Sequence, residues 1–159
     1  MNFRRSPFDW LLEGVSLTGL LASFALAAGA WSTLPDVVPT HFGISGAPNG
    51  WGSKQTIWLL PGIGLLIYLL LSVAAHYPRF VNLPFAVDRN APEVQRIIFR
   101  LLASSKAVTM LLFAYIVRGQ IQLAINRGDN LGILLLPLFL AATTVPFIVY
   151  LRQLRRYRR

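Results

Sequence analysis

The segment TIWLLPGIGLLIYLLLSVAA, residues 56–75, contains no charged side chain and decides the fold class. The hydrocarbon core of a bilayer is roughly 30 Å thick, and a helix of about 20 predominantly apolar residues crosses it. Because that core offers no water to satisfy backbone N–H and C=O groups, a helix is the form that such a single run takes there. The segment therefore predicts a transmembrane helix.

Three further apolar runs have the length of a membrane span: residues 10–32, 106–125 and 131–151. Across the 159 residues, 55% are hydrophobic and 13% are charged, which is about half the charged share of an average soluble domain. We therefore predict an all-α integral membrane protein, with residues 1–159 forming a single four-transmembrane-helix bundle. An ordered outer loop, the cap, is expected at residues 34–54 between helices 1 and 2, and a cytoplasmic tail at residues 152–159.

The basic residues predict the orientation of the bundle. The net charge is +9, from 15 Lys and Arg against 6 Asp and Glu, and cytoplasmic segments hold the excess of Lys and Arg in membrane proteins. Eleven basic residues lie before the first span, between the second and third, and after the fourth, against two in the other loops, Lys54 and Arg127. The eleven are Arg4, Arg5, Arg79, Arg89, Arg96, Arg100, Arg152, Arg155, Arg156, Arg158 and Arg159. We expect a multi-pass protein of the bacterial inner membrane with both termini cytoplasmic.

The first span has a second interpretation, because Arg4 and Arg5 precede it and Ala28-Gly29-Ala30 near its end imitates a signal-peptide cleavage site. The apolar run is longer than a usual signal-peptide core and contains Glu13. An uncleaved helix is therefore favoured.

The third helix is expected to begin well before its span and to run over residues 92–126. Asn90 can cap it, Pro92 suits its first turn, and Glu93 favours the positive end of the helix dipole. Its first turns alternate charged and apolar residues, which predicts an interfacial amphipathic segment. In the first helix, Gly19, Ser23 and Ala27 form a small-residue stripe that we expect to pack against another helix.

The cap, LPDVVPTHFGISGAPNGWGSK at residues 34–54, is the most distinctive stretch of the chain. Pro39 favours extended backbone before it, and Pro48-Asn49-Gly50 is typical of a tight turn. Ser53 is expected to cap the second helix. The pattern predicts an ordered loop that folds back on itself.

The succession of Pro-x-His-Phe and Gly-x-Pro-x-Gly-Trp-x-x-Lys resembles a bacterial membrane-protein family of unknown function, and the same module resembles the N-terminal part of Sdp-type immunity proteins. The resemblance covers the first half of the chain and implies protection against a secreted toxin and a role in membrane signalling. Where that family has an Asn after the Phe and an Asp in the turn, this chain has Gly43 and Asn49. The residues that carry the resemblance are Pro35, Pro39, His41, Phe42, Gly46, Pro48, Gly50, Trp51 and Lys54.

Two charges lie inside the third span, where an isolated charge is costly. Lys106 either extends towards the cytoplasmic interface or pairs with Glu13 of the first helix. Arg118 lies roughly 13 Å below the outer end of its helix, and Gln122 follows one turn later. We expect both to face the bundle interior, with Asp36 as the counter-ion of Arg118, or alternatively with a ligand or partner there.

The remaining chemistry favours binding over catalysis. The absence of Cys excludes disulfides and thiolate metal sites, and His41 with Asp36 falls short of the three or four ligands that a zinc site needs. We expect no catalytic residue, no metal and no cofactor. His41 is expected to bond loop backbone, with pH sensing or ligand binding as the alternative.

The function predicted from these features is that of a non-enzymatic membrane binding protein of the immunity or sensing type, which recognises a peptide, lipid or small ligand. The alternative is an accessory or structural subunit of a larger membrane complex, and an enzyme acting on a lipid or isoprenoid ranks third. Membrane lipids are expected to contact the Arg-rich tail, and nucleic acid is not an expected partner. The candidate ligand or structural site comprises Asp36, Pro39, His41, Phe42, Gly46, Trp51, Lys54, Lys106, Arg118 and Gln122.

Overall fold

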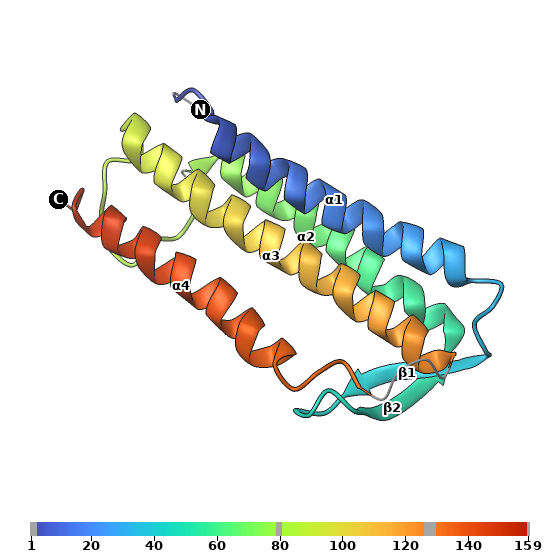
Figure 1. Ribbon diagram of the computed structural model, residues 1–159. Coiled ribbons are helices and arrows are strands. Elements are labelled where there is room, and N and C mark those ends of the chain that lie inside the picture. Colours follow the sequence, from blue (N-terminus) through green and yellow to red (C-terminus); the bar gives the residue numbers. More distant parts are fainter. Residues whose placement is uncertain (1–2, 79–80, 126–129, 159) are drawn as a thin grey trace.

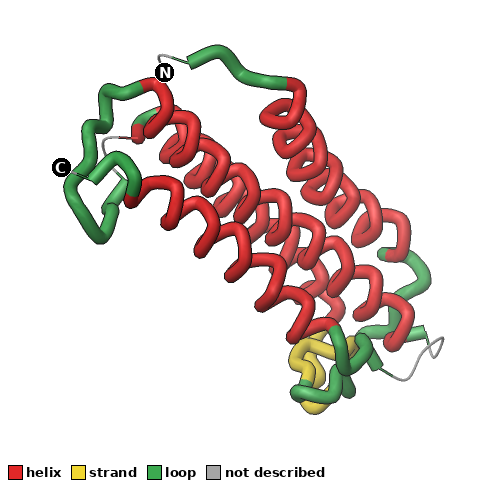
Figure 2. Tube along the Cα trace, turned by 60° about the vertical axis from the view of Figure 1, so that its left-hand side comes forward, coloured by secondary structure: helices red, strands yellow, loops and turns green. Residues whose placement is uncertain are grey.

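The computed structural model describes residues 3–78, 81–125 and 130–158. Within these residues, four long helices lie side by side, and a small two-stranded sheet covers one end of the bundle (Figures 1 and 2). The helices are α1 (Pro7–Ala30), α2 (Leu59–His76), α3 (Pro92–Ala124) and α4 (Leu135–Arg155), and a short 3₁₀ helix η1 (Lys54–Trp58) leads into α2. All four passages are long and apolar enough to cross a membrane. The predicted fold class is confirmed, and the chain is a multi-pass membrane protein.

The two ends of the bundle differ in what they carry. The N- and C-terminal segments lie at one end, here called the terminal end, and the sheet lies at the other, the hairpin end (Figure 1). The two termini share an end because the chain runs along the bundle four times, and each passage is antiparallel to the one before it.

Helix starts depend on side-chain caps in α1 but not in α3. Ser6 and Asp9 form a capping box, in which the Ser6 backbone N–H donates to Asp9 Oδ2 over 2.7 Å and the Asp9 N–H donates to Ser6 Oγ over 3.3 Å. Helix α3 begins at Pro92 as predicted, but Ala91 is its N-cap and Asn90 is not. The proline compensates, because its missing N–H removes one unpaired donor of the first turn.

Helix α3 is the central element, since it contacts α1, α2 and α4. The predicted small-residue stripe is confirmed as a packing surface, because Gly19, Ser23 and Ala27 are all buried. At Gly19 the approach is closest: a Cβ atom there would lie 2.9 Å from the backbone carbonyl carbon of Met110. The stripe therefore allows the backbones of α1 and α3 to approach each other.

The first turns of α3 are amphipathic, since Glu93 and Arg96 are exposed on one side while apolar residues are buried on the other. Val94 and Ile98 are fully buried, and they pack with Leu154 of α4 and with apolar residues of the segment 81–87. The apolar side of these turns therefore packs within the chain, and their position at a membrane interface stays a prediction.

The cap is a β-hairpin. Strand β1 (Val37–Phe42) pairs antiparallel with β2 (Pro48–Ser53), from the pair Val37 and Ser53 to the pair Phe42 and Pro48. The connection is closed by Gly43 and Ala47, whose N–H and C=O groups are 2.9 Å apart.

The tight turn predicted at residues 48–50 is wrong, because those residues belong to β2. The turn uses Gly46, which has φ of +79°, a conformation that costs a side-chain-bearing residue free energy. Gly50 has a different purpose: a Cβ atom there would lie 2.9 Å from His41 Cβ on the opposite strand. Ser53 occupies the N-cap position of η1 but makes no capping hydrogen bond, and its hydroxyl donates to Gln55 Oε1 instead.

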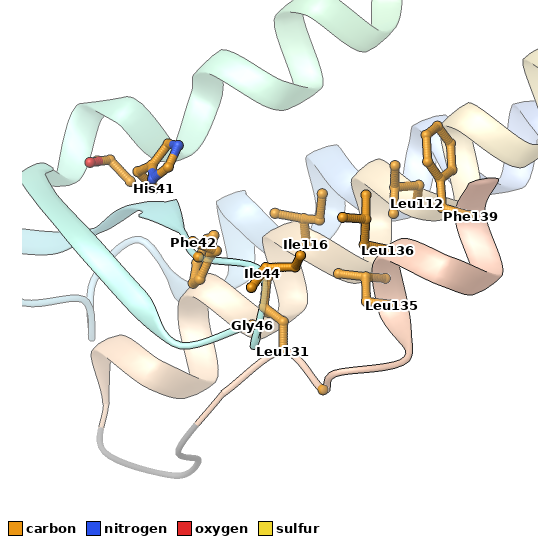
Figure 3. Close-up of a pocket in the computed structure, with 13 residues that line it drawn as sticks. His41, Phe42, Ile44, Gly46, Leu112, Ile116, Leu131, Leu135, Leu136 and Phe139 are labelled. Atoms are coloured by element: carbon orange, nitrogen blue, oxygen red, sulfur yellow. The ribbon is translucent and has the colours of Figure 1, made fainter.

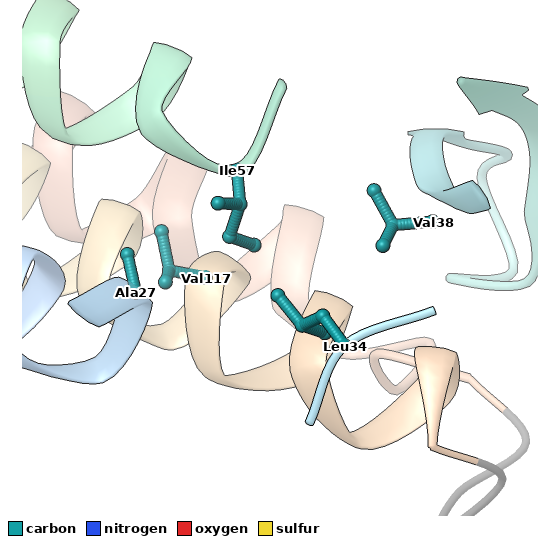
Figure 4. Packing of buried hydrophobic residues seen from close by; sticks show 5 residues of the cluster. All are labelled: Ala27, Leu34, Val38, Ile57 and Val117. Atoms are coloured by element: carbon teal, nitrogen blue, oxygen red, sulfur yellow. The ribbon is translucent and has the colours of Figure 1, made fainter. Parts of the chain in front are cut away.

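A compact apolar cluster joins the hairpin to the helices (Figure 4). Val38 of β1 is fully buried and belongs to the same cluster as side chains of α1, η1 and α3. The buried members of the cluster are Ala27, Leu34, Val38, Ile57 and Val117. The hairpin is therefore part of the core and not a loop lying over it.

Candidate functional site

Two hydrogen bonds attach the hairpin to the second half of the chain. The Gln120 side-chain amide on α3 donates from Nε2 to the carbonyl oxygen of Pro39 over 3.0 Å, and both residues are buried. The Leu131 N–H donates to the carbonyl oxygen of Gly46 over 2.9 Å. Tyr115 in turn donates its hydroxyl to the carbonyl oxygen of Leu131 over 2.7 Å. These bonds hold the turn of the hairpin over α3 and the start of α4.

A cavity of about 480 Å³ lies beneath that turn (Figure 3). Its hairpin side includes Phe42 and Ile44, and its helix side includes leucines of α3 and α4 and Phe139. The full lining is Thr40, His41, Phe42, Gly43, Ile44, Gly46, Leu112, Ile116, Leu131, Gly132, Leu135, Leu136 and Phe139. The volume falls within the range of roughly 300–1,000 Å³ that is usual for ligand pockets, and the lining is mostly apolar.

A second hollow of about 440 Å³ shares Leu112, Leu131 and Leu135 with the first and reaches Val108 of α3 and Ala142 of α4. The two hollows together follow the contact between α3 and α4 away from the hairpin end. An occupant would therefore meet apolar side chains along about two turns of each helix.

Among the residues that the structure describes, Ile44 is the most exposed large apolar residue, with 83% of its surface accessible. It lies at the tip of the hairpin and also lines the cavity. An exposed apolar side chain at the mouth of an apolar cavity is suited to contact a partner or the bilayer.

His41 is exposed at the edge of the same cavity, and its partner is not the one expected. Its Nδ1 lies 2.5 Å from Oδ1 of Asn49 on the opposite strand. The prediction of a hydrogen bond to loop backbone is therefore wrong. Because Gly50 brings the two strands close at this point, the imidazole reaches a side-chain amide across the hairpin.

Asp36 and Lys54 close the base of the hairpin. Their charged groups are 3.7 Å apart, and the Asp36 side chain is 97% exposed. The Lys54 ammonium also lies 5.2 Å from the centre of the Trp31 ring, a cation–π contact. Trp51, a candidate site residue, is 57% exposed.

Arg118 is exposed, and the predicted pair with Asp36 is wrong, because Asp36 pairs with Lys54. The buried side of α3 in this region runs through Val117, Gln120 and Leu123. These positions are three residues apart and so share a helix face, from which Arg118 is turned away. Gln122 is half-buried, and Gln120 is the polar side chain that contacts the cap.

Lys106 lies in a buried cluster nearer the terminal end. Its ammonium is 2.8 Å from Glu13 Oε2 and donates to Ser72 Oγ over 2.8 Å, and it lies 4.5 Å from the centre of the Tyr68 ring. The Lys106 side chain is 1% exposed. The predicted pair with Glu13 is confirmed, and the cluster connects α1, α2 and α3.

A third ion pair, which was not predicted from the sequence, lies at the start of α1. Arg100 Nε is 2.7 Å from Asp9 Oδ1 and its Nη2 donates to Ser6 Oγ over 3.1 Å. Arg100 thus completes the capping box from α3. Within residues 3–78, 81–125 and 130–158, no group of three or more His, Asp or Glu side chains is placed to hold a metal ion.

The fold and this geometry define the class: a multi-pass membrane protein with a helical bundle, a hairpin cap and an apolar cavity between them. Residues 18–65 match the family described as Domain of unknown function (DUF1648). The match runs from α1 through the hairpin into α2, so it contains one wall of the cavity but neither α3 nor α4.

One relative is an uncharacterized protein of Archaeoglobus fulgidus, which is 36% identical over 62 residues. The matched part spans about a third of each protein, 34% of this chain and 34% of the relative. No solved structure matches the chain.

Proposed function

We propose that this protein is a non-enzymatic membrane binding protein of the immunity or sensing type, and that it binds a hydrophobic peptide segment at the hairpin end. The observation that carries the proposal is the apolar cavity of about 480 Å³ between the hairpin turn and helices α3 and α4. Burial of an apolar side chain in such a space is favourable by about 1.5–3 kcal/mol.

The two-stranded sheet favours a ligand with an extended backbone. The sheet has two strands, so in the described part of the chain each strand has one edge without a neighbouring strand. An extended peptide can add to such an edge through main-chain hydrogen bonds while its side chains enter a pocket. Ile44, exposed at the tip, provides a first apolar contact.

The resemblance of the cap to the N-terminal part of Sdp-type immunity proteins supports the same choice, since direct binding of a membrane-active peptide is one way to protect a cell against it. We place the hairpin end outside the bacterial inner membrane and both termini in the cytoplasm, because the excess of Lys and Arg lies at the terminal end. A secreted peptide would then reach the cavity from outside or from the outer leaflet.

Binding in place of catalysis is supported by the partners of the charged groups. The His41 ring is held by the side-chain amide of Asn49 within the hairpin itself. Lys106 and Glu13 form an ion pair with each other, and neither residue lines the cavity.

Photo-cross-linking tests the proposal. A benzophenone amino acid at Ile44, in cells challenged with a hydrophobic membrane-active peptide, is expected to give an adduct of the mass of that peptide. The matched control is the same probe at Leu70, which is exposed on α2 and does not line the cavity. Equal adducts at both sites, or an adduct of lipid mass alone at Ile44, would contradict peptide binding.

The cavity itself is tested by filling it. Replacing Ile116, a cavity residue of α3, by Trp is expected to abolish the peptide adduct at Ile44 and any protection of cells. The thermal unfolding of the variant in detergent shows whether the bundle remains folded.

The second candidate function, an accessory subunit of a larger membrane complex, is favoured by α4. Leu154 is the one residue of α4 that is buried within the chain, so the rest of this apolar helix offers a long surface that lipid or another membrane protein covers. Purification in mild detergent, with the same probe at Val145 on α4, distinguishes the two. A stoichiometric protein adduct there supports the subunit function.

A further inference from the structure

A third cavity lies at the terminal end, away from the proposed peptide site. Its volume is about 470 Å³, and it is formed between the segment after α2 and the end of α4. Pro84 and Phe85 line it from the first segment, and Leu151, Arg155 and Arg158 from the second. A β-bridge between Val87 and Arg158 holds the two segments together.

The two arginines of this cavity carry charge that the described part of the chain does not neutralise. The ion pairs among residues 3–78, 81–125 and 130–158 are those of Lys54 with Asp36, Arg100 with Asp9, and Lys106 with Glu13. Arg155 and Arg158 are both exposed. Guanidinium groups present fixed forks of donors, which match the oxygen atoms of a phosphate.

Apart from the two arginines, the lining of the cavity is apolar. Phe85 and Leu151 are half-buried, and both pack against the cluster formed by Val94, Ile98 and Leu154. Because α4 is long enough to cross a membrane and Arg155 is its last residue, the cavity lies where a helix leaves the hydrocarbon core. Phosphate groups of lipids lie at that level, with their chains directed inward.

We infer that this cavity binds the headgroup of an anionic phospholipid, with the phosphate between Arg155 and Arg158 and the start of an acyl chain along Phe85 and Leu151. A diffuse attraction between an Arg-rich tail and a charged membrane would use every arginine alike. In this structure, however, Arg155 and Arg158 line the cavity, whereas Arg152 and Arg156 do not.

The experiment compares two variants of equal charge. The full-length protein is purified with Arg155 and Arg158 both replaced by Gln, or with Arg152 and Arg156 both replaced by Gln. Native mass spectrometry then measures how much phosphatidylglycerol and how much phosphatidylcholine each retains. The first variant is expected to lose about tenfold or more of its preference for phosphatidylglycerol, because contacts to a charged group contribute on that scale. The second variant is expected to keep most of it.

Equal losses in the two variants would overturn the inference, because they would show a response to net charge alone. No loss in either would overturn it as well. If the Gln variant does not fold, the Arg155→Lys and Arg158→Lys variant keeps the charge and removes the fork, and it is expected to lose part of the preference. Retention unchanged in that variant would contradict recognition by the two guanidinium forks.

A separate arm distinguishes lipid from free phosphate. Inorganic phosphate, added to the wild-type protein at the concentration of phosphatidylglycerol that raises the unfolding temperature, is expected to give a much smaller rise. Phe85→Ala is expected to weaken lipid retention without changing the response to phosphate. A full response to inorganic phosphate would show an anion site and would overturn the assignment to a lipid.

Discussion

The Lys106 ammonium lies 2.8 Å from Glu13 Oε2 and is 1% exposed. The pair joins α1 to α3 inside helices that are long enough to cross a membrane, and Ser72 adds α2 to the same point. A charge in this position needs its partner, because the surrounding medium cannot solvate it.

The pair is expected to show strong energetic coupling. Glu13→Gln or Lys106→Met alone should each cost about 3–5 kcal/mol of stability, because each leaves a buried charge or its partner without compensation. The double variant should cost less than the sum of the two. Thermal unfolding in detergent, followed by Trp fluorescence, provides the double-mutant cycle. Additive losses would show that the two groups do not interact.

The contact between α1 and α3 at Gly19 is expected to tolerate no side chain. In Gly19→Ala the new Cβ would meet the Met110 backbone at 2.9 Å, so we expect a loss of about 1–3 kcal/mol from overpacking. Gly14→Ala is the matched control, because nothing lies within 4 Å of a Cβ there. The two unfolding temperatures in the same detergent decide the matter, and an equal response would contradict close packing at Gly19.

The turn of the hairpin is expected to depend on Gly46. Its φ of +79° and the 2.9 Å between a Cβ placed there and the Gly132 backbone nitrogen both oppose a side chain. Gly46→Ala should cost about 1–2 kcal/mol from the backbone conformation alone and should release the bond from Leu131. Hydrogen exchange of the Leu131 amide should become faster. In the control Gly43→Ala, where a Cβ would have ordinary contacts at 3.5 Å, the exchange rate should change little.

The orientation of the bundle can be measured directly, because the chain contains no cysteine. Asn49→Cys places a thiol on the hairpin, and Tyr157→Cys places one near the C-terminus. A membrane-impermeant maleimide should label the first in intact cells and the second only after permeabilisation. Labelling of Tyr157→Cys from outside would reverse the assignment of both termini to the cytoplasm.

Several features of this protein follow from local properties of the sequence. Length and apolarity predict where helices cross a membrane, because a bilayer imposes about 20 residues on each passage. The start of α3 at Pro92 follows from the fixed φ and missing donor of proline. The pair of Glu13 and Lys106 could also be predicted from the sequence, because both residues lie at similar depth in membrane-spanning helices, where an unpaired charge is costly.

Only the tertiary structure decided how each helix is rotated and which segments meet. Arg118 and Gln120 are two residues apart, which places them about 200° apart around the helix axis, and this is why Arg118 points outward while Gln120 reaches Pro39. The hairpin turn at Gly46, and not at residues 48–50, depends on contacts with Leu131 and Gly132 far along the chain. The cavities beneath the hairpin and beside Arg155 are spaces between such segments. They exist because packing brings together residues whose local sequences carry no signal of one another.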